Sequence, residues 1–459
     1  MQSIGLETPP GSMDSDVIII GGGLAGMTAA ALLARAGRSV VVLEKGHRFG
    51  GRGGTTVRDG AAFNLGPHAL YSDGDAFRIL RELHVSFSGN RPRTEALLVL
   101  AQGKPHRLPQ GLTSLITSSL FSWRDKFKLS KFPRQLIGFD TRPLDHTPLA
   151  AWIQQVAAES RFADLLKMFL RVSTYSADYD LISAGAAIDQ FRIGFGGGVL
   201  YLDHGWQTLI DGLQSVAKAN GARFLAGSRA TEVTTDNQGV LVKLADGRSL
   251  SGAAAILAVE PETAADLLRL PQSQPLAKWT AARVQVRAAC LDVALRGLPQ
   301  PDRLVAFGLD CPLYYSVHSA SARLAPDGVS VVHLAKYLRH EHSEAPETVE
   351  HELEALMDTL QPGWRDRLVA RRYFPHMVVT QALPEAASGG LQGRPATTVA
   401  NHPRVFLAGD WVGARGMLAD AAAASAEESA QRVLKLLSDA PRAQLLPVSM
   451  IEDHEHAAR

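Results

Sequence analysis

The chain has 459 residues, with 47 Lys and Arg against 46 Asp and Glu, and a formal net charge of +1. This balance gives no field strong enough to gather nucleic acid, and no apolar run reaches the roughly 20 residues that cross a bilayer. The cysteines, Cys290 and Cys311, are too few for a disulfide framework or a Cys/His metal site. We therefore expect a cytoplasmic protein of two connected domains, without a metal, a nucleic-acid partner or a transmembrane segment.

The two ends of the chain differ in character from the rest. Residues 1–12 have neither a helical face nor the apolar core of a signal peptide, so we expect them to be a tag or disordered. The polar stretch 439–459 predicts a flexible tail.

The first folded unit reads as strand, glycine turn, helix and strand. The apolar run 16–20 enters the glycines of 21–26, an Ala-rich helix follows over 27–37, and 39–45 is again apolar. A strand that is apolar throughout is typical of a parallel sheet covered on both faces. The pattern predicts half of a dinucleotide-binding βαβ unit.

The later elements predict a second, different sheet. Residues 94–195 show helical periodicity and predict an inserted helical region, whereas 281–337 alternates as antiparallel strands do. Between and after these regions we expect a helix at 206–220, strands within 222–235, at 240–244, at 253–259 and at 405–408, and a final helix over 417–437.

Gly21, Gly23 and Gly26 form the spacing G-x-G-x-x-G where the first strand meets the helix. Gly21 allows a tight turn, Gly23 lets the backbone approach a pyrophosphate, and the helix N-terminus offers free N–H groups to the anion. Glu44, at the end of the second strand, is placed to accept hydrogen bonds from a ribose diol, with Lys45 beside it. This fingerprint leaves NAD and FAD equally possible.

A second glycine cluster, 50–54, surrounds one arginine. Four glycines around Arg52, Gly51 among them, indicate backbone packed against a ligand. Arg52 is suited to pair with a phosphate or to stack on a ring.

Three segments together resemble the superfamily of FAD-dependent amine oxidases, protoporphyrinogen oxidases and phytoene desaturases. They are DVIIIGGGLAGMTAAALLARAGRSVVVLEKGHRFGGR at 16–52, FNLGPHAL at 63–70 and VFLAGDWVGARGMLADAAAASAEESA at 405–430. The resemblance implies an α/β fold, with a Rossmann-type FAD-binding domain like that of glutathione reductase and an inserted α+β substrate domain. The implied boundaries are 13–93, 200–265 and 395–438 for the FAD-binding domain, and 94–199 and 266–394 for the substrate domain.

The resemblance also assigns site residues. In the family the late Asp contacts the ribityl or pyrophosphate part of FAD, and the following helix points its N-terminus at the flavin. These roles fall on Gly409 and Asp410 and on Gly416, Met417 and Leu418. The strand whose backbone meets adenine places that contact on Ala230, and the middle segment brings Gly66, Pro67 and His68 near the flavin. Some members attach FAD to a cysteine near the closing motif, but none follows Cys311, so the resemblance implies non-covalent FAD.

Candidates for contact with the substrate are His68, Tyr314 and His318. His68 either steers the substrate and tunes the flavin or is a hydrogen-bonded structural histidine. Tyr314 and His318 share one face of a predicted strand, with Tyr315 opposite, and they line a pocket or pack in the core. Lys336 invites comparison with the lysine near flavin N5 in amine oxidases, although a solvated lysine is the simpler interpretation.

Segment 111–140 mixes Leu, Phe and Trp with Lys and Arg, so a peripheral membrane contact is possible. Its prolines and acidic residue favour packing into the helical domain instead.

As a member of this superfamily, the protein is expected to oxidise or desaturate a small, largely apolar organic molecule by hydride transfer to flavin N5, as phytoene desaturase-like enzymes do. The alternatives are a flavin amine oxidase, and a non-catalytic prenyl or lipid carrier resembling Rab GDP-dissociation inhibitors. An NAD-dependent dehydrogenase fits the first fingerprint alone but leaves the closing motif without a role.

Overall fold

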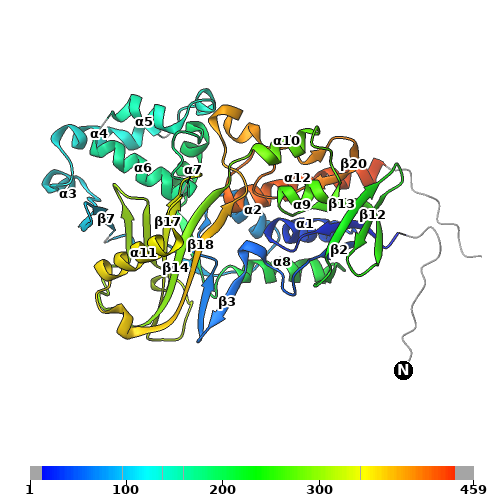
Figure 1. The fold of residues 1–459 in the computed structure, drawn as a ribbon, viewed down its shortest axis with the longest axis horizontal. Coiled ribbons are helices and arrows are strands. Elements are labelled where there is room, and N and C mark those ends of the chain that lie inside the picture. The colour runs from blue at the N-terminus through cyan, green and yellow to red at the C-terminus, as the bar shows by residue number, and fades with distance from the viewer. Residues whose placement is uncertain (1–12, 96, 137, 159, 342, 440–459) are drawn as a thin grey trace, which may run out of the picture.

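A computed structural model describes residues 13–95, 97–136, 138–158, 160–341 and 343–439 (Figure 1). The predicted tag, 1–12, and all of the predicted tail after residue 439 lie outside the described residues.

An eight-stranded sheet carries the glycine turn. Its order is β10-β2-β1-β13-β12-β11, with β20 beside β13 and β19 beside β20. Strands β1, β2, β10, β13 and β20 are parallel where they pair. The strands are β1 (Ser15–Ile20), β2 (Val40–Leu43), β10 (Arg223–Leu225), β11 (Ala230–Thr235), β12 (Val240–Leu244), β13 (Ser249–Leu257), β19 (Thr398–Val399) and β20 (His402–Leu407).

Helices cover both faces of this sheet, as the apolar strands require. The Ala-rich α1 (Leu24–Arg35) and α12 (Leu418–Asp439) pack closely on one face with α8 (Gln207–Ala219), because alanines allow close approach. The shorter α9 (Pro261–Leu267) and α10 (Pro275–Ala282) contribute to the core on the other face. This layer arrangement confirms the predicted Rossmann-type α/β unit.

A seven-stranded sheet, mostly antiparallel, forms the second layer system. Its order is β18-β14-β17-β16-β15-β7-β8, and α11 (Pro346–Leu360) packs on one face through Val349, Leu353 and Leu360. The strands are β7 (Leu98–Ala101), β8 (Lys104–Arg107), β14 (Val286–Arg296), β15 (Val305–Gly308), β16 (Leu313–Val317), β17 (Val329–Leu338) and β18 (Leu368–Thr380).

Strands β7 and β8 correct the prediction that helical structure begins at residue 94. Gln102 and Gly103 connect them, with φ angles of 52° and 73°. Positive φ at both residues of a two-residue loop is the condition for a type I′ hairpin turn. The hairpin then extends the sheet, because β7 pairs in parallel with β15.

The helical region comprises α3 (Leu112–Thr117), α4 (Trp123–Leu136), α5 (Leu149–Ala157), α6 (Arg161–Thr174) and α7 (Ala184–Gly196). The favoured packing of segment 111–140 into the core is wrong for two aromatic side chains. Trp123 is 72% exposed and Phe127 is 62% exposed. Being four residues apart, they share the outward face of α4, and the Lys126 ammonium lies 4.7 Å from the Trp123 ring centre.

Short elements connect the two sheets: β3 (Thr55–Arg58) with β4 (Ala61–Asn64), and β5 (Leu70–Tyr71) and β6 (Gly89–Asn90) with β9 (Val199–Leu202). Phe63 of β4 and Tyr201 of β9 are buried against the seven-stranded sheet. They therefore fix one sheet against the other.

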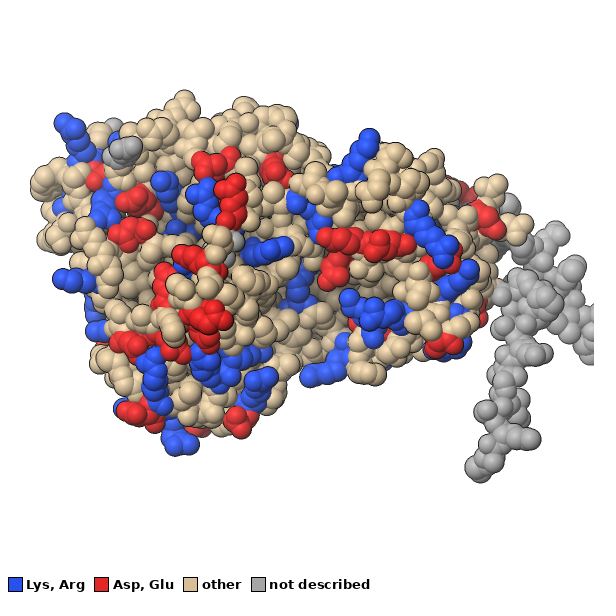
Figure 2. Space-filling model, viewed as in Figure 1, with Lys and Arg blue, Asp and Glu red and all other residues tan. Residues whose placement is uncertain are grey.

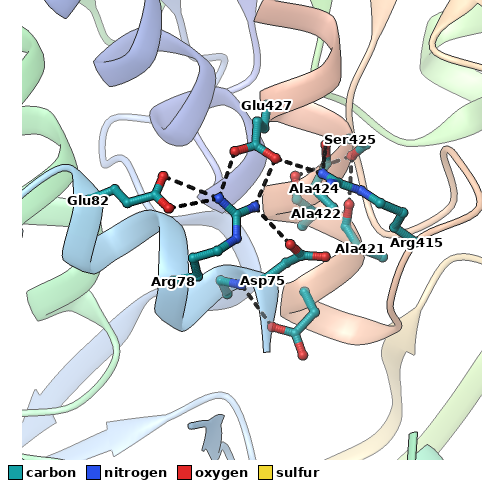
Figure 3. Close-up of polar contacts among 11 residues, drawn as sticks. Asp75, Arg78, Glu82, Arg415, Ala421, Ala422, Ala424, Ser425 and Glu427 are labelled. Carbon is teal, nitrogen blue, oxygen red and sulfur yellow. Dashed lines mark hydrogen bonds and ion pairs between the residues drawn. The ribbon is translucent and has the colours of Figure 1, made fainter. Parts of the chain in front are cut away.

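Helix α2 (Asp75–Glu82) binds α12 through the ion-pair network drawn in Figure 3. Arg78 donates to Asp75 and Glu82 of its own helix and to Glu427 of α12 at 2.9 Å, and Glu427 also accepts from Arg415. The network therefore joins α2 and Arg415 to the third turn of α12.

On the face of the molecule shown in Figure 2, basic and acidic side chains are interspersed. Among the described residues, no helix combines the length and apolarity needed to span a bilayer. The described part of the chain also contains no group of three His, Cys, Asp or Glu side chains suited to hold a metal.

Candidate cofactor site

The glycine turn leaves no room for a side chain at Gly21 or at Gly26. Gly21 has a φ of 110°, and a Cβ there would lie 2.2 Å from the carbonyl oxygen of Ala258. A Cβ on Gly26 would lie 1.9 Å from the carbonyl oxygen of Gly21. The tight fit brings the start of α1 against the strand ends, where its free N–H groups face a cavity.

Glu44 closes the other side of the turn. Its carboxylate accepts hydrogen bonds from the N–H of Gly22 at 2.8 Å and from the N–H of Gly46 at 2.7 Å. These bonds fix the carboxylate at the end of β2, on the cavity wall. Lys45 also lines the wall, with its Nζ 3.9 Å from the carboxylate of Glu260.

A bidentate ion pair joins the second glycine cluster to the closing motif. Arg52 donates from Nη1 and Nη2 to the two carboxylate oxygens of Asp410, at 2.5 and 2.9 Å, and Nη1 also donates to the carbonyl of Val379. Asp410 is buried, which alone favours its neutral form, yet the Arg52 charge and hydrogen bonds hold the pKa of Asp410 below its usual value. The pair is therefore ionised.

These elements surround one cavity of about 360 Å³. Most of the predicted cofactor residues line it: Gly21, Gly23, Glu44, Lys45, Gly51, Arg52, Pro67, His68, Ala230, Gly409, Asp410 and Leu418. The sequence thus brings segments from both ends of the chain to one site.

Four predicted residues lie behind the wall rather than on it: Gly26, Gly66, Gly416 and Met417. Gly26 supports the glycine turn, and a Cβ on Gly66 would meet Met377 at 2.7 Å and Cys290 at 2.9 Å. The carbonyl of Gly416 accepts a hydrogen bond from Arg394. Met417 is buried in the core of the helical region.

The sequence prediction missed two parts of the wall. Residues 258–260 follow β13, which lies beside β1 in the sheet. Ligands of open parallel sheets bind at the carboxyl ends of the strands, so the place of residues 258–260 directly after a strand could have predicted their position in the wall. Tyr175, Trp206 and Met377 come from distant segments, and no local pattern marks them. Tyr175 ends α6 with a φ of 58°, a strained conformation for an aromatic residue.

Helix α12 begins at the cavity, as the resemblance implies. Leu418 and Ala422 line the wall from its first turns, where the helix dipole is positive. Asp420, behind them, accepts a hydrogen bond from the N–H of Ala76 at 2.9 Å. Burial raises the pKa of Asp420 to about 7.

Two of the three substrate-side candidates, Tyr314 and His318, lie together but set back from the cavity. Tyr314 and His318 are buried, with the hydroxyl 3.3 Å from Nε2, and Tyr201 stacks on His318 with 3.7 Å between ring centres. Tyr315 is on the opposite face of the sheet, where it bonds Gln361 at 2.8 Å. The predicted division of faces is therefore observed, although neither Tyr314 nor His318 belongs to the wall.

His68 and Lys336 differ in position. His68 lines the cavity, and burial lowers its pKa to about 4. Lys336 lies away from the wall and makes ion pairs with Glu344 and Glu352. It therefore does not occupy the position of a lysine beside the flavin.

The geometry described so far defines a dinucleotide-binding α/β protein whose cavity is closed by a second sheet. Residues 24–434 match the family of flavin-containing amine oxidoreductases, and the chain belongs to this family, whose members are flavin enzymes. The match confirms the resemblance inferred from the three segments.

Solved structures share the fold at low sequence identity. An oxidoreductase from Methanosarcina mazei aligns over 90% of this chain and 99% of its own, with a TM-score of 0.71 and 20% identity. A putrescine oxidase with bound putrescine aligns over 92% and 99%, with a TM-score of 0.71 and 16% identity.

Sequence relatives match only in part. A putative flavin-containing monoamine oxidase of Mycobacterium tuberculosis is 27% identical over 56% of this chain and 59% of its own length. A carotenoid 3,4-desaturase of Haloarcula japonica is 40% identical over 17% of this chain, and the match spans 15% of the desaturase.

Proposed function

We propose that the cavity binds FAD non-covalently and that the protein oxidises or desaturates a small, largely apolar organic molecule. The observation that supports this most is the Arg52–Asp410 pair, which joins the glycine cluster to the loop between β20 and α12 on one cavity wall. A site assembled from both ends of the chain fits a ligand as long as FAD. The NAD-dependent alternative leaves this second half of the site without a ligand.

The residues present fit each part of such a ligand. The N-terminus of α1 faces the pyrophosphate through Gly21 and Gly23, and Glu44 accepts from the ribose hydroxyls. Ala230 offers backbone to the adenine, while the first turn of α12 meets the flavin ring. When bound, the flavin supplies the acceptor for a hydride, and the chain supplies position and electrostatics. The lining residues include no cysteine, in keeping with non-covalent binding.

The wall beyond the flavin position favours an apolar substrate. Tyr175 and Met377 line the cavity there and, like the half-buried Phe374, pack against a buried cluster that includes Tyr314 and Tyr337. The carboxylates of the wall, Glu44, Glu260 and Asp410, all belong to the dinucleotide side. An ammonium group would therefore find no lining carboxylate at the substrate end, which favours a desaturase-like reaction over amine oxidation.

Amine oxidation remains the second candidate because putrescine oxidase and the mycobacterial monoamine oxidase are among the similar proteins. A screen decides between the two. Purified protein is mixed anaerobically with polyenes, amines and porphyrinogens, and bleaching of the flavin absorbance is recorded. Bleaching by polyenes supports the proposal, whereas bleaching by amines alone contradicts it. Protein that is colourless and takes up no added FAD favours the carrier alternative.

We also propose that the surface formed by Ile116, Trp123 and Phe127 contacts membranes that hold the substrate. Helix α4 has five Lys or Arg against one Asp, so its charge complements anionic lipid beside exposed aromatic rings. The test is flotation with anionic and neutral vesicles. Trp123→Ser should lower binding to anionic vesicles, whereas Val57→Ser, an exposed residue of β3, should not. Equal binding of all three proteins contradicts the proposal.

A further inference from the structure

The imidazole of His68 is held between two hydrogen-bond acceptors. Its Nδ1 lies 3.2 Å from the carbonyl oxygen of Gly66, and its Nε2 lies 3.1 Å from the carbonyl oxygen of Arg52. A carbonyl only accepts, and a neutral imidazole carries one N–H. In the neutral form one ring nitrogen therefore presents a lone pair to a carbonyl oxygen, whereas the imidazolium donates to both carbonyls.

The ring and both carbonyls are fixed in these positions. The edge of His68 packs against Trp206, with 5.0 Å between ring centres and an angle of 66° between planes. The backbone of Gly66 has a φ of 72°, with Met377 and Cys290 packed against it. Arg52 is tied by its side chain to Asp410 and to the carbonyl of Val379. Rotating the imidazole away from either acceptor would disturb this packing.

The charged and titratable groups around His68 explain why it is neutral without a ligand. Besides burial, the groups that act on the pKa of His68 are the two carbonyls, His333 and Asp292. His318 is also close, because a positive charge on His68 opposes protonation of His318. Burial is the largest effect and lowers the pKa of His68 to about 4. The electrostatic effect of His333 also lowers the pKa of His68, whereas the charge on Asp292 raises it.

The charge of Asp292 is already engaged. Its Oδ1 lies 2.6 Å from Nδ1 of His333, and its Oδ2 accepts from Nε of Arg372 at 2.8 Å. Both Asp292 and His333 are fully buried. The site therefore has the hydrogen-bond geometry of an imidazolium but lacks a free negative charge to stabilise it.

We propose that His68 takes up a proton when negative charge develops on the group bound in the cavity, and so balances that charge. The inference rests on the proposed binding of FAD. Two electrons and one proton convert oxidised flavin to its reduced anion, and in this proposal a second proton, taken from solvent, binds His68. The electrons come from the substrate or, in the test, from a chemical reductant. His68 would then hold a positive charge beside the reduced flavin, and release its proton on reoxidation.

The test counts protons rather than turnovers. Holoenzyme in weak buffer with a pH-indicator dye is titrated anaerobically with dithionite, after correction for the protons that dithionite itself releases. We expect His68→Gln and His68→Asn, whose neutral amides cannot gain a proton, to take up one proton fewer per flavin than the wild type. The absorbance of reduced flavin distinguishes its anionic from its neutral form and should show the anion in the wild type.

A control variant and the flavin content of the wild type separate the possible outcomes. His84→Asn changes an exposed histidine whose φ of 56° asparagine accepts readily, so its proton count should equal that of the wild type. An equal count in the His68 variants, with flavin bound, overturns the inference and leaves the proposed function intact. A neutral reduced flavin in the wild type overturns it as well. Absence of bound flavin from the wild type contradicts the proposed function itself.

Discussion

The two sheets meet at one cavity but contribute to it in different ways. The eight-stranded sheet supplies strand ends, glycines and the N-termini of α1 and α12, so its part of the site is mostly backbone. The seven-stranded sheet supplies residues of β18 to the wall, and away from the wall it holds a buried row in which Arg372, Asp292 and His333 pair across three strands. Backbone sites are marked by local spacing in the sequence. Side-chain sites depend on which strands pair, and local spacing does not record that.

The largest effect should come from the buried row. Asp292→Asn removes the charge that Arg372 and His333 share, and leaves Arg372 buried without its carboxylate. We expect the free energy of unfolding to fall by about 3–5 kcal/mol, measured by urea denaturation. Flavin content per folded protein should stay near that of the wild type, because the row does not line the cavity. Loss of flavin at unchanged stability would show that the two regions are not separate.

Arg52→Ala, unlike Asp292→Asn, should lower both the stability and the flavin content. Removing the guanidinium leaves the Asp410 carboxyl group buried without its cation, so stability should fall by about 1–3 kcal/mol, discounted because the Arg52 side chain is 42% exposed, and the cofactor should be lost as well. The measurements are the ratio of flavin to protein absorbance and the melting temperature. Arg432→Ala, which breaks an exposed pair with Glu428 one helical turn away, is the matched control. If Arg52→Ala retains flavin as the control does, the pair is not part of the cofactor site.

Asp420 should make the free energy of unfolding depend on pH. Its folded-state pKa of about 7 lies above that of an unfolded aspartate, so the folded state binds the extra proton between these values. The wild type should therefore lose stability as pH rises from about 4 to about 7. Asp420→Asn cannot take up this proton, so its stability should not show this pH dependence. At pH 8 it should be more stable than the wild type by about 2 kcal/mol. The gain is no larger because the N-terminus of α2 stabilises the ionised Asp420 and so offsets part of the cost of its burial. Parallel stability curves for the two proteins would contradict this.

The smallest effect belongs to the network of Figure 3. The Arg78 side chain is 41% exposed, so its pairs with Asp75, Glu82 and Glu427 are screened by water. Arg78→Ala should cost about 0.5–1 kcal/mol, and the cost should shrink in high salt. Thermal denaturation at low and high salt measures both. A cost that is independent of salt would indicate lost packing of the arginine stem instead.

The part of the cavity wall next to the eight-stranded sheet could be predicted from the sequence because its signals are local. The turn at Gly21 and the carboxylate of Glu44 lie within one βαβ unit, whose spacing is set by the ligand. Asp410 was reached only through the resemblance, since nothing local connects it to Arg52.

The parts that were missed depend on long-range pairing. Asp292 and Arg372 meet across a strand pair 80 residues apart in the chain. The sequence analysis predicts a helical region where the β7–β8 hairpin lies, because these short strands carry little periodic signal. Trp123 was assigned to the core on composition, although exposure depends on which face of α4 is covered.

The Arg52–Asp410 pair also has a consequence for biosynthesis, because its partners are separated by 358 positions. A nascent polypeptide that ends before Asp410 contains the whole glycine turn but an incomplete binding site. Translation proceeds at about 5–20 residues per second, so the ribosome must add hundreds of residues before the late partner emerges. Cofactor capture is therefore expected only after Asp410 has emerged, and chains truncated ahead of Asp410 should accumulate without flavin.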